Sequence, residues 1–113
     1  INENSSMKKA LAIITKKKLG ILIATNKKKL TTGIITDGQI RRSSQKKSSI
    51  IELSVKKVMT KNPISVDKDM LAVKSLAIMS ENKITSLCVH KKNNRKKTIG
   101  VLHIHNILDG NIS

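Results

Sequence analysis

The chain has 113 residues, carries 23 Lys and Arg against 7 Asp and Glu, and contains no Phe, Tyr or Trp. Its length suits one ordinary domain or two very small ones, and its apolar runs are too short for a transmembrane helix. A single cysteine, Cys88, excludes an internal disulfide framework and fits a reducing compartment. We therefore expect a cytoplasmic protein with no membrane association.

The first predicted helix carries one apolar stripe at helical spacing, formed by Met7, Ala10, Leu11 and Ile14. Three polar residues before this stripe are candidate N-caps, namely Asn4, Ser5 and Ser6. An apolar run at 19–24, a polar turn at 26–29 and a second apolar run then predict a β-hairpin. A short helix is expected at 37–45.

The same order of elements recurs later in the chain. One shift aligns residues 10–15 with 75–80 and 19–24 with 84–89, and a slightly longer one aligns 33–36 with 100–103. The second helix is predicted from a stripe of Ala72, Val73, Leu76, Ala77 and Met79, with Asp67 or Asp69 as its cap. A hairpin with its turn at 91–97 and a short helix at 105–109 follow.

A further segment, Val58–Val66, precedes the second copy. Pro63 cannot donate to a sheet, so residues 64–66 are predicted to form an edge strand. The repeat shift places the matching strand of the first copy before Ile1, and we expect a C-terminal fragment of a longer protein. The predicted fold is α+β, with two pseudo-twofold β-α-β-β-α units at 1–49 and 50–113, the first lacking its initial strand.

Two motifs give these units a family resemblance. Val-Met-Thr-x-Asn-Pro begins the second unit, and Gly-x-x-Thr-Asp-Gly precedes the last helix of the first. Units of this kind resemble CBS domains, and two in tandem resemble a CBS pair or Bateman module. Residues 33–42, and 83–86 with 100–108, are similar to the C-terminal CBS pair of arabinose-5-phosphate isomerases, and the His-x-His at 103–105 is the more specific mark.

This resemblance implies a regulatory module and no catalysis by the fragment itself. The parent protein would carry a SIS sugar-isomerase domain that supplies arabinose 5-phosphate for the Kdo of lipopolysaccharide. CBS pairs commonly form flat dimers, so a homodimer is expected. No cofactor is required.

The resemblance also implies ligand sites in the clefts between the repeats, with phosphates near helix N-termini, where unpaired N–H groups favour anions. One cleft would use Thr36, Gly38 and Gln39. The other would use His103, His105 and Asn106, with walls formed by Lys61, Asn62, Pro63, Ile64, Thr85 and Ser86. The expected effector is small and anionic, either a nucleotide or the sugar nucleotide CMP-Kdo.

The family places an Asp three residues after the Thr, whereas this chain has Gln39 and Asn106 there. An amide lacks the charge-assisted bond of a carboxylate to a ribose diol. An alternative is therefore a degenerate CBS pair that serves only oligomerisation.

A third interpretation is a basic nucleic-acid-binding domain, given the net charge of +16. Against it, all basic residues except Arg41, Arg42 and Arg95 are Lys, and no aromatic ring can stack on a base. Arg41 and Arg42 could clamp a phosphate, bind an acidic partner or face solvent. Four side chains could be considered for zinc (Cys88, His90, His103 and His105), but their spacing is not that of a structural site, and no metal is expected.

Overall fold

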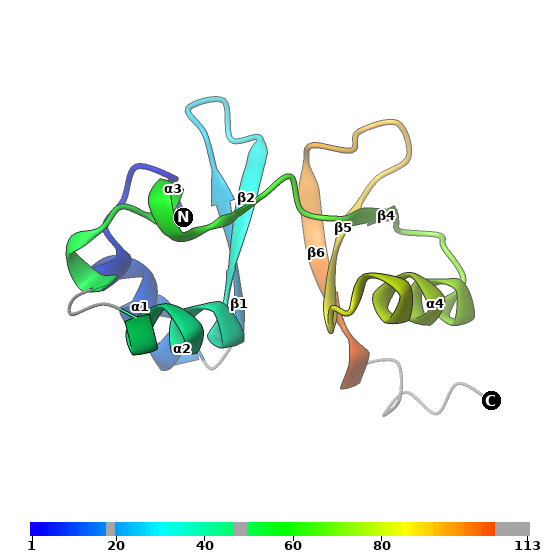
Figure 1. The fold of residues 1–113 in the computed structure, drawn as a ribbon. Coiled ribbons are helices and arrows are strands. Elements are labelled where there is room, and N and C mark those ends of the chain that lie inside the picture. Colours follow the sequence, from blue (N-terminus) through cyan, green and yellow to red (C-terminus); the bar gives the residue numbers. More distant parts are fainter. Residues whose placement is uncertain (18–19, 47–49, 106–113) are drawn as a thin grey trace. The chain divides into compact units, whose positions relative to one another are not determined.

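The computed structural model describes residues 1–17, 20–46 and 50–105. The chain divides into two compact units, Ile1–Asn62 and Pro63–Ser113, and each contains a three-stranded sheet (Figure 1). The predicted α+β fold is confirmed. No helix in this part of the chain is both long and apolar enough to cross a bilayer.

The first unit is an antiparallel sheet in the order β1-β2-β3, with α1 and α2 on one side of it. Its elements are α1 (Met7–Lys17), β1 (Ile21–Thr25), β2 (Thr31–Thr36), α2 (Asp37–Lys46), the 3-10 helix η1 (Ile50–Glu52), α3 (Val55–Val58) and β3 (Thr60–Lys61). The predicted helix and hairpin are thus confirmed. The Ser6 hydroxyl accepts a hydrogen bond from the Lys9 amide at 3.3 Å, so Ser6 acts as the N-cap of α1.

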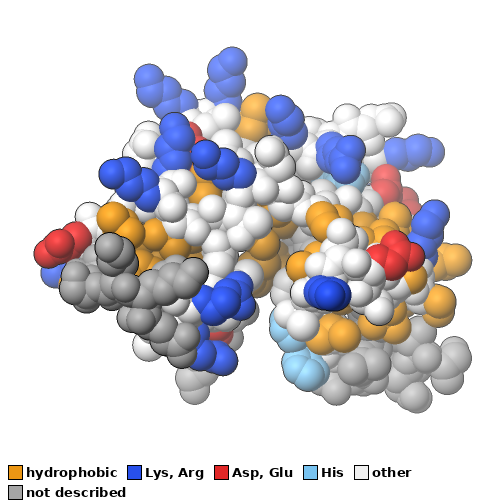
Figure 2. All heavy atoms as spheres, in the orientation of Figure 1, with side chains coloured by type: hydrophobic (Ala, Val, Ile, Leu, Met, Phe, Trp, Pro, Cys, Tyr) orange, Lys and Arg blue, Asp and Glu red, His pale blue; other side chains and the backbone are white. Residues whose placement is uncertain are grey.

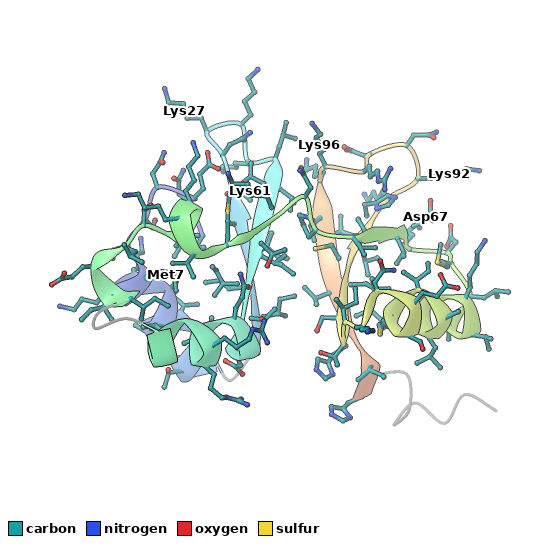
Figure 3. All side chains as sticks on the ribbon, in the orientation of Figure 1. Met7, Lys27, Lys61, Asp67, Lys92 and Lys96 are labelled. Carbon is teal, nitrogen blue, oxygen red and sulfur yellow. The ribbon has the colours of Figure 1, made fainter. Side chains whose placement is uncertain are left out.

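The predicted stripe of α1 forms the centre of the first core. Met7, Ala10 and Ile14 are buried, and Leu11 packs against them from the rim. Figure 3 shows Met7 inside the first unit. The cluster is completed by Leu22, Ala24, Ile35, Ile50, Val55 and Met59.

The second unit has the strand order β4-β5-β6, with β4 parallel and β6 antiparallel to β5. Its elements are β4 (Ser65–Asp67), α4 (Ala72–Asn82), β5 (Ser86–His90) and β6 (Thr98–His103). The predicted edge strand and hairpin are confirmed, with β4 beginning one residue later than expected. The core cluster consists of Val66, Met79 and Leu87, ringed by half-buried side chains of α4 and the sheet.

The first unit shows a counterpart of β4. Asn2 forms a parallel bridge with Thr25, and the Thr25 amide donates to the Ile1 carbonyl at 2.8 Å. The repeat shift converts this pair into Asp67 and His90, which are partners in the second sheet. The first unit was expected to lack its initial strand. In its place, the described chain has one β-bridge, at the position that β4 occupies in the second unit.

Helix α4 corrects two predictions. Its buried face is formed by Ser75 and Met79 with half-buried Ala72 and Leu76, whereas Val73 is 71% exposed and Ala77 is also exposed. The predicted stripe was wrong for Val73 and Ala77. A face that includes these two residues and the observed face that includes Ser75 both fit helical spacing, and apolar character alone favoured the wrong one.

The predicted caps of α4 were also wrong. Leu71 is the N-cap residue and makes no side-chain hydrogen bond to the helix. The Asp67 carboxylate instead accepts from the Asp69 amide at 2.9 Å, which forms a turn before the helix.

Residues 50–62, expected to open the second repeat, pack within the first unit. Ile50, Val55 and Met59 join its core, and β3 pairs with β2. Between β3 in the first sheet and β4 in the second lie only residues 62–64. The helix expected at 105–109 falls, apart from His105, outside the described residues.

Candidate functional site

Thr36 and Gln39 form a reciprocal capping box at the start of α2. The Gln39 amide donates to the Thr36 hydroxyl at 3.2 Å, and the Thr36 amide donates to Gln39 Oε1 at 3.2 Å. Thr followed three residues later by Gln is the sequence pattern of this motif. The two side chains expected to receive a ligand thus also hold the helix N-terminus in place.

Gln39 has a further partner far along the chain. Its Nε2 donates to the Val58 carbonyl at 2.8 Å, so the amide uses both of its ends. The start of α2 is therefore tied to the end of α3. A ligand that engaged Gln39 would have to compete with one of these bonds.

The charges around the start of α2 are mixed. Asp37 lies in the first turn, where a carboxylate favours the helix dipole but disfavours a bound anion. A Cβ added to Gly38 would lie 3.3 Å from Nη1 of Arg42, so the guanidinium lies over this glycine. Gly38 thus allows a cation to approach the first turn of the helix.

The Val-Met-Thr-x-Asn-Pro segment runs along the edge of the first sheet. Met59 is buried, and Lys61 is exposed on β3 beside Gly33 (Figure 3). Asn62 has φ of 50°, a left-handed conformation that Asn tolerates better than most residues, and its amide donates to the Thr32 carbonyl at 3.3 Å. The segment therefore turns at Asn62 and enters the second unit at Pro63.

In the second unit, Ser86 and His103 lie opposite each other at one end of the hairpin. The Ile104 amide donates to the Thr85 carbonyl at 2.8 Å, which keeps the chain after β6 beside the start of β5. The His103 and His105 rings are stacked with centroids 4.8 Å apart. The structure thus brings four of the predicted site residues together here: Thr85, Ser86, His103 and His105.

His103 takes the position that Thr36 holds in the first repeat. Its Nδ1 accepts a hydrogen bond from the His105 amide at 3.1 Å. A neutral imidazole that accepts at Nδ1 carries its proton on Nε2. In both repeats, the last residue of the second hairpin strand therefore accepts a hydrogen bond from a backbone amide that follows it in the chain.

The other predicted residues are divided between the units. Lys61 and Asn62 lie in the first unit with Thr36, Gly38 and Gln39, whereas Pro63 and Ile64 lie in the second. The Ile64 carbonyl accepts from the Cys88 amide at 3.1 Å, so its backbone is part of the second sheet. Asn106 lies outside the described residues.

Cys88 is 1% exposed, and burial raises the pKa of its thiol, partly offset by a hydrogen bond with Thr98. Its strand neighbour His90 is buried and is hydrogen-bonded through Nδ1 to the Ser65 hydroxyl. Within residues 1–17, 20–46 and 50–105, no group of three His, Cys, Asp or Glu side chains could hold a metal ion. Cys88 thus behaves as a core side chain.

Sequence reasoning missed one group at the first strand end and left open the role of a second, Arg42. The Val58 carbonyl is a partner of Gln39, and Arg42 lies over Gly38. The Thr-x-x-Gln spacing could have indicated the capping box. Nothing in the sequence indicates the bond to Val58, because it joins residues 19 positions apart.

Comparison with known proteins agrees with this architecture. The chain is 33% identical over 108 residues to arabinose 5-phosphate isomerase KdsD of Escherichia coli K12, covering 96% of this chain and 32% of that protein. The chain thus spans about a third of the length of the curated relatives it matches. The resemblance to this isomerase family is confirmed.

The solved structures give the same result for the fold. The CBS-domain protein ATU1752 of Agrobacterium tumefaciens has a TM-score of 0.88 at 19% identity, covering 99% of this chain and 82% of that one. A CBS domain protein of Pyrobaculum aerophilum, PAE2072, complexed with AMP, has a TM-score of 0.83 at 18% identity, covering 94% and 79%. The family model of the CBS domain matches residues 55–111. With two similar units, matching strand registers and this match, the chain belongs to the CBS domain family.

Proposed function

We propose that this chain is a regulatory module that binds a small anionic effector of the nucleotide class at the two strand ends. The observation that carries the proposal is the equivalence of Thr36 and His103, each an acceptor at the end of the second hairpin strand. A CBS domain protein with the same fold has been solved with AMP. The proposed sites comprise the residues that the resemblance implied, including Asn106.

The local charge favours an anion over a neutral ligand. Arg42 lies over the first turn of α2, and Lys61 is exposed on the neighbouring β3. A phosphate near a helix N-terminus also gains from the backbone N–H groups. Asp37 opposes this in part, so we expect the phosphate to approach from the side of Arg42.

Because the chain matches part of KdsD, we propose that it is attached to a sugar-phosphate isomerase domain and itself performs no catalysis. An effector would act by binding one arrangement of the two units better than another. CMP-Kdo is the sugar nucleotide that the isomerase resemblance puts forward, by analogy. A buried, reduced Cys88 agrees with a cytoplasmic location.

Thermal unfolding with AMP, CMP or CMP-Kdo tests effector binding. A ligand at 100 times its dissociation constant adds about 2.7 kcal/mol of stability. We expect a shift with at least one of these ligands, reduced in Thr36→Val or His105→Ala and unchanged in Thr15→Val, which alters an exposed threonine of α1. No shift with any of the three would remove the proposal.

A second candidate function, a degenerate pair that serves only assembly, is favoured by one observation. Both ends of the Gln39 amide are already bonded within the protein, to Thr36 and to Val58. This candidate predicts a homodimer by light scattering and no response to any nucleotide. A ligand-induced shift that Thr36→Val removes would exclude it.

A nucleic-acid-binding function receives less support. On the face shown in Figure 2, the Lys and Arg side chains are scattered and do not form one continuous patch. Lys27 lies in one hairpin turn, and Lys92 and Lys96 lie in the other (Figure 3). Binding to DNA that depends steeply on salt would revive this function.

A further inference from the structure

One side chain supports the ends of two helices in the first unit. Gln39 Oε1 accepts from the Thr36 amide at 3.2 Å at the start of α2, and Gln39 Nε2 donates to the carbonyl of Val58, the last residue of α3, at 2.8 Å. The last carbonyls of a helix have no partner within that helix. Gln39 therefore caps α3 from outside, and its amide can serve both helix ends because it is a donor and an acceptor at once.

The segment after Val58 leads into the edge strand β3. This strand pairs with β2 over two residue pairs, and both of its residues are exposed. Met59 anchors its beginning, since a Cβ added to Gly33 would lie 2.5 Å from Met59 Sδ. The Asn62 amide bonds the Thr32 carbonyl at its end. A strand this short depends on its flanking contacts, so the bond to the Val58 carbonyl contributes to its pairing.

An anionic effector can reach the Gln39 amide from the side of Arg42. A Cβ added to Gly38 would lie 3.3 Å from Arg42 Nη1 and 4.0 Å from Thr36 Oγ1, so a cation and a hydroxyl approach the same point in the first turn of α2. Hydrogen bonds to a charged acceptor are roughly twice as strong as those to a neutral one. A phosphate oxygen at this point would therefore outcompete the Val58 carbonyl for Gln39 Nε2. Water can replace the amide at Val58, which is half-buried.

We propose that Gln39 couples effector binding to the pairing of β3. An effector that bonds the Gln39 amide draws it away from Val58, and residues 59–61 then separate more readily from β2. The coupling is reciprocal, so the intact bond to Val58 also lowers the affinity for the effector. This inference rests on the proposed function, because it needs an effector at the start of α2.

Deuterium exchange at the amides of residues 59–61 tests the coupling. The probe is AMP, or CMP or CMP-Kdo if AMP gives no thermal shift, at a concentration that saturates the shift. We expect exchange at 59–61 to become at least about threefold faster with the probe, while exchange in α1 becomes slower because ligand binding stabilises the fold as a whole. A purely structural Gln39 would give slower exchange at both places.

Two variants serve as controls. Gln39→Met removes both amide bonds at nearly constant side-chain length, so exchange at 59–61 should already be fast without the probe and should not rise further. Asn82→Leu removes an amide that donates to the Ile78 carbonyl of α4 in the second unit, and it should leave the response at 59–61 intact.

The outcomes separate this inference from the proposed function. No thermal shift with AMP, CMP or CMP-Kdo would remove both. A thermal shift without faster exchange at 59–61, or with the same increase in Gln39→Met, would overturn the coupling alone, because the effector would then act without the bond from Gln39 to Val58.

Discussion

The buried core of the first unit draws on α1, both hairpin strands, η1, α3 and Met59, whereas that of the second draws on one residue each from β4, α4 and β5. Much of this difference comes from residues 50–62, which supply Ile50, Val55 and Met59 to the first unit. The described part of the second unit has no such addition. Two units of one plan can therefore differ in stability according to which neighbouring segment covers them.

The largest expected effect comes from Met59→Ala, which removes a buried side chain from the segment that covers the first unit. Truncation of a buried Met costs about 2–5 kcal/mol, and we expect about 3 kcal/mol in the free energy of unfolding by urea. Amide exchange should quicken in β2 and β3. The control, Met70→Ala, alters a half-buried side chain of the second unit and should cost less; equal losses would contradict the comparison.

Gly33→Ala and Gly100→Ala compare equivalent glycines in β2 of the first sheet and β6 of the second. The first variant places a methyl group against the Thr60 carbonyl, which cannot move without disturbing the pairing of β2 with β3. We expect a loss of about 2 kcal/mol, as for overpacked sites. Gly100→Ala should leave stability unchanged or raise it by about 0.5 kcal/mol. Similar losses at both glycines would show that β2 and β6 are equally crowded at these positions.

Gln39→Ala and Gln39→Glu separate the two roles of this side chain. Alanine removes both the capping bond and the bond to Val58, and we expect a loss of about 1–2 kcal/mol. Glutamate keeps an acceptor for the Thr36 amide but loses the donor to Val58. Exchange should therefore quicken at 58–61 in both variants and at the start of α2 only in the alanine variant, and the opposite pattern would refute the assignment.

The smallest expected effect is the pH dependence caused by Cys88. Burial raises the pKa of the thiol in the folded chain above its ordinary value of 9.0. Above about pH 9 the unfolded thiol therefore loses its proton more readily than the folded one, and the free energy of unfolding falls. Cys88→Ala should remove this part of the pH dependence. The check is the free energy of unfolding by urea, measured at several pH values for the original chain and for the variant. If both proteins lose the same stability as the pH rises, the result would argue against a buried neutral thiol.

The sequence predicted the elements whose apolar pattern is unambiguous. The stripe of α1 and both hairpins follow from local spacing, since their apolar residues fit one period. Helix α4 was harder, because Val73 and Ala77 fit a helical face as well as Ser75 and Met79 do. The buried face includes Ser75, whose hydroxyl has no hydrogen-bond partner in the described structure, and a burial of this kind has no local signal.

The candidate site was predictable only in part for a similar reason. Thr36 and Gln39 lie three residues apart, and their capping box follows from sequence. The bond from Gln39 to Val58 and the fit of Met59 over Gly33 depend on where a distant segment crosses the sheet. Tertiary contacts of this type determine which polar atoms remain available for a ligand.

The passage of the chain from β3 to β4 has a practical consequence for dissecting the protein. The family pattern begins at residue 55, but the second compact unit begins at Pro63. If the two repeats were expressed separately with the cut before residue 55, the first repeat would lose its edge strand β3 and the buried side chain of Met59. The first half would then lack the buried side chains Val55 and Met59 and would expose the core residues that they cover, so the two halves should be produced with the cut after Asn62.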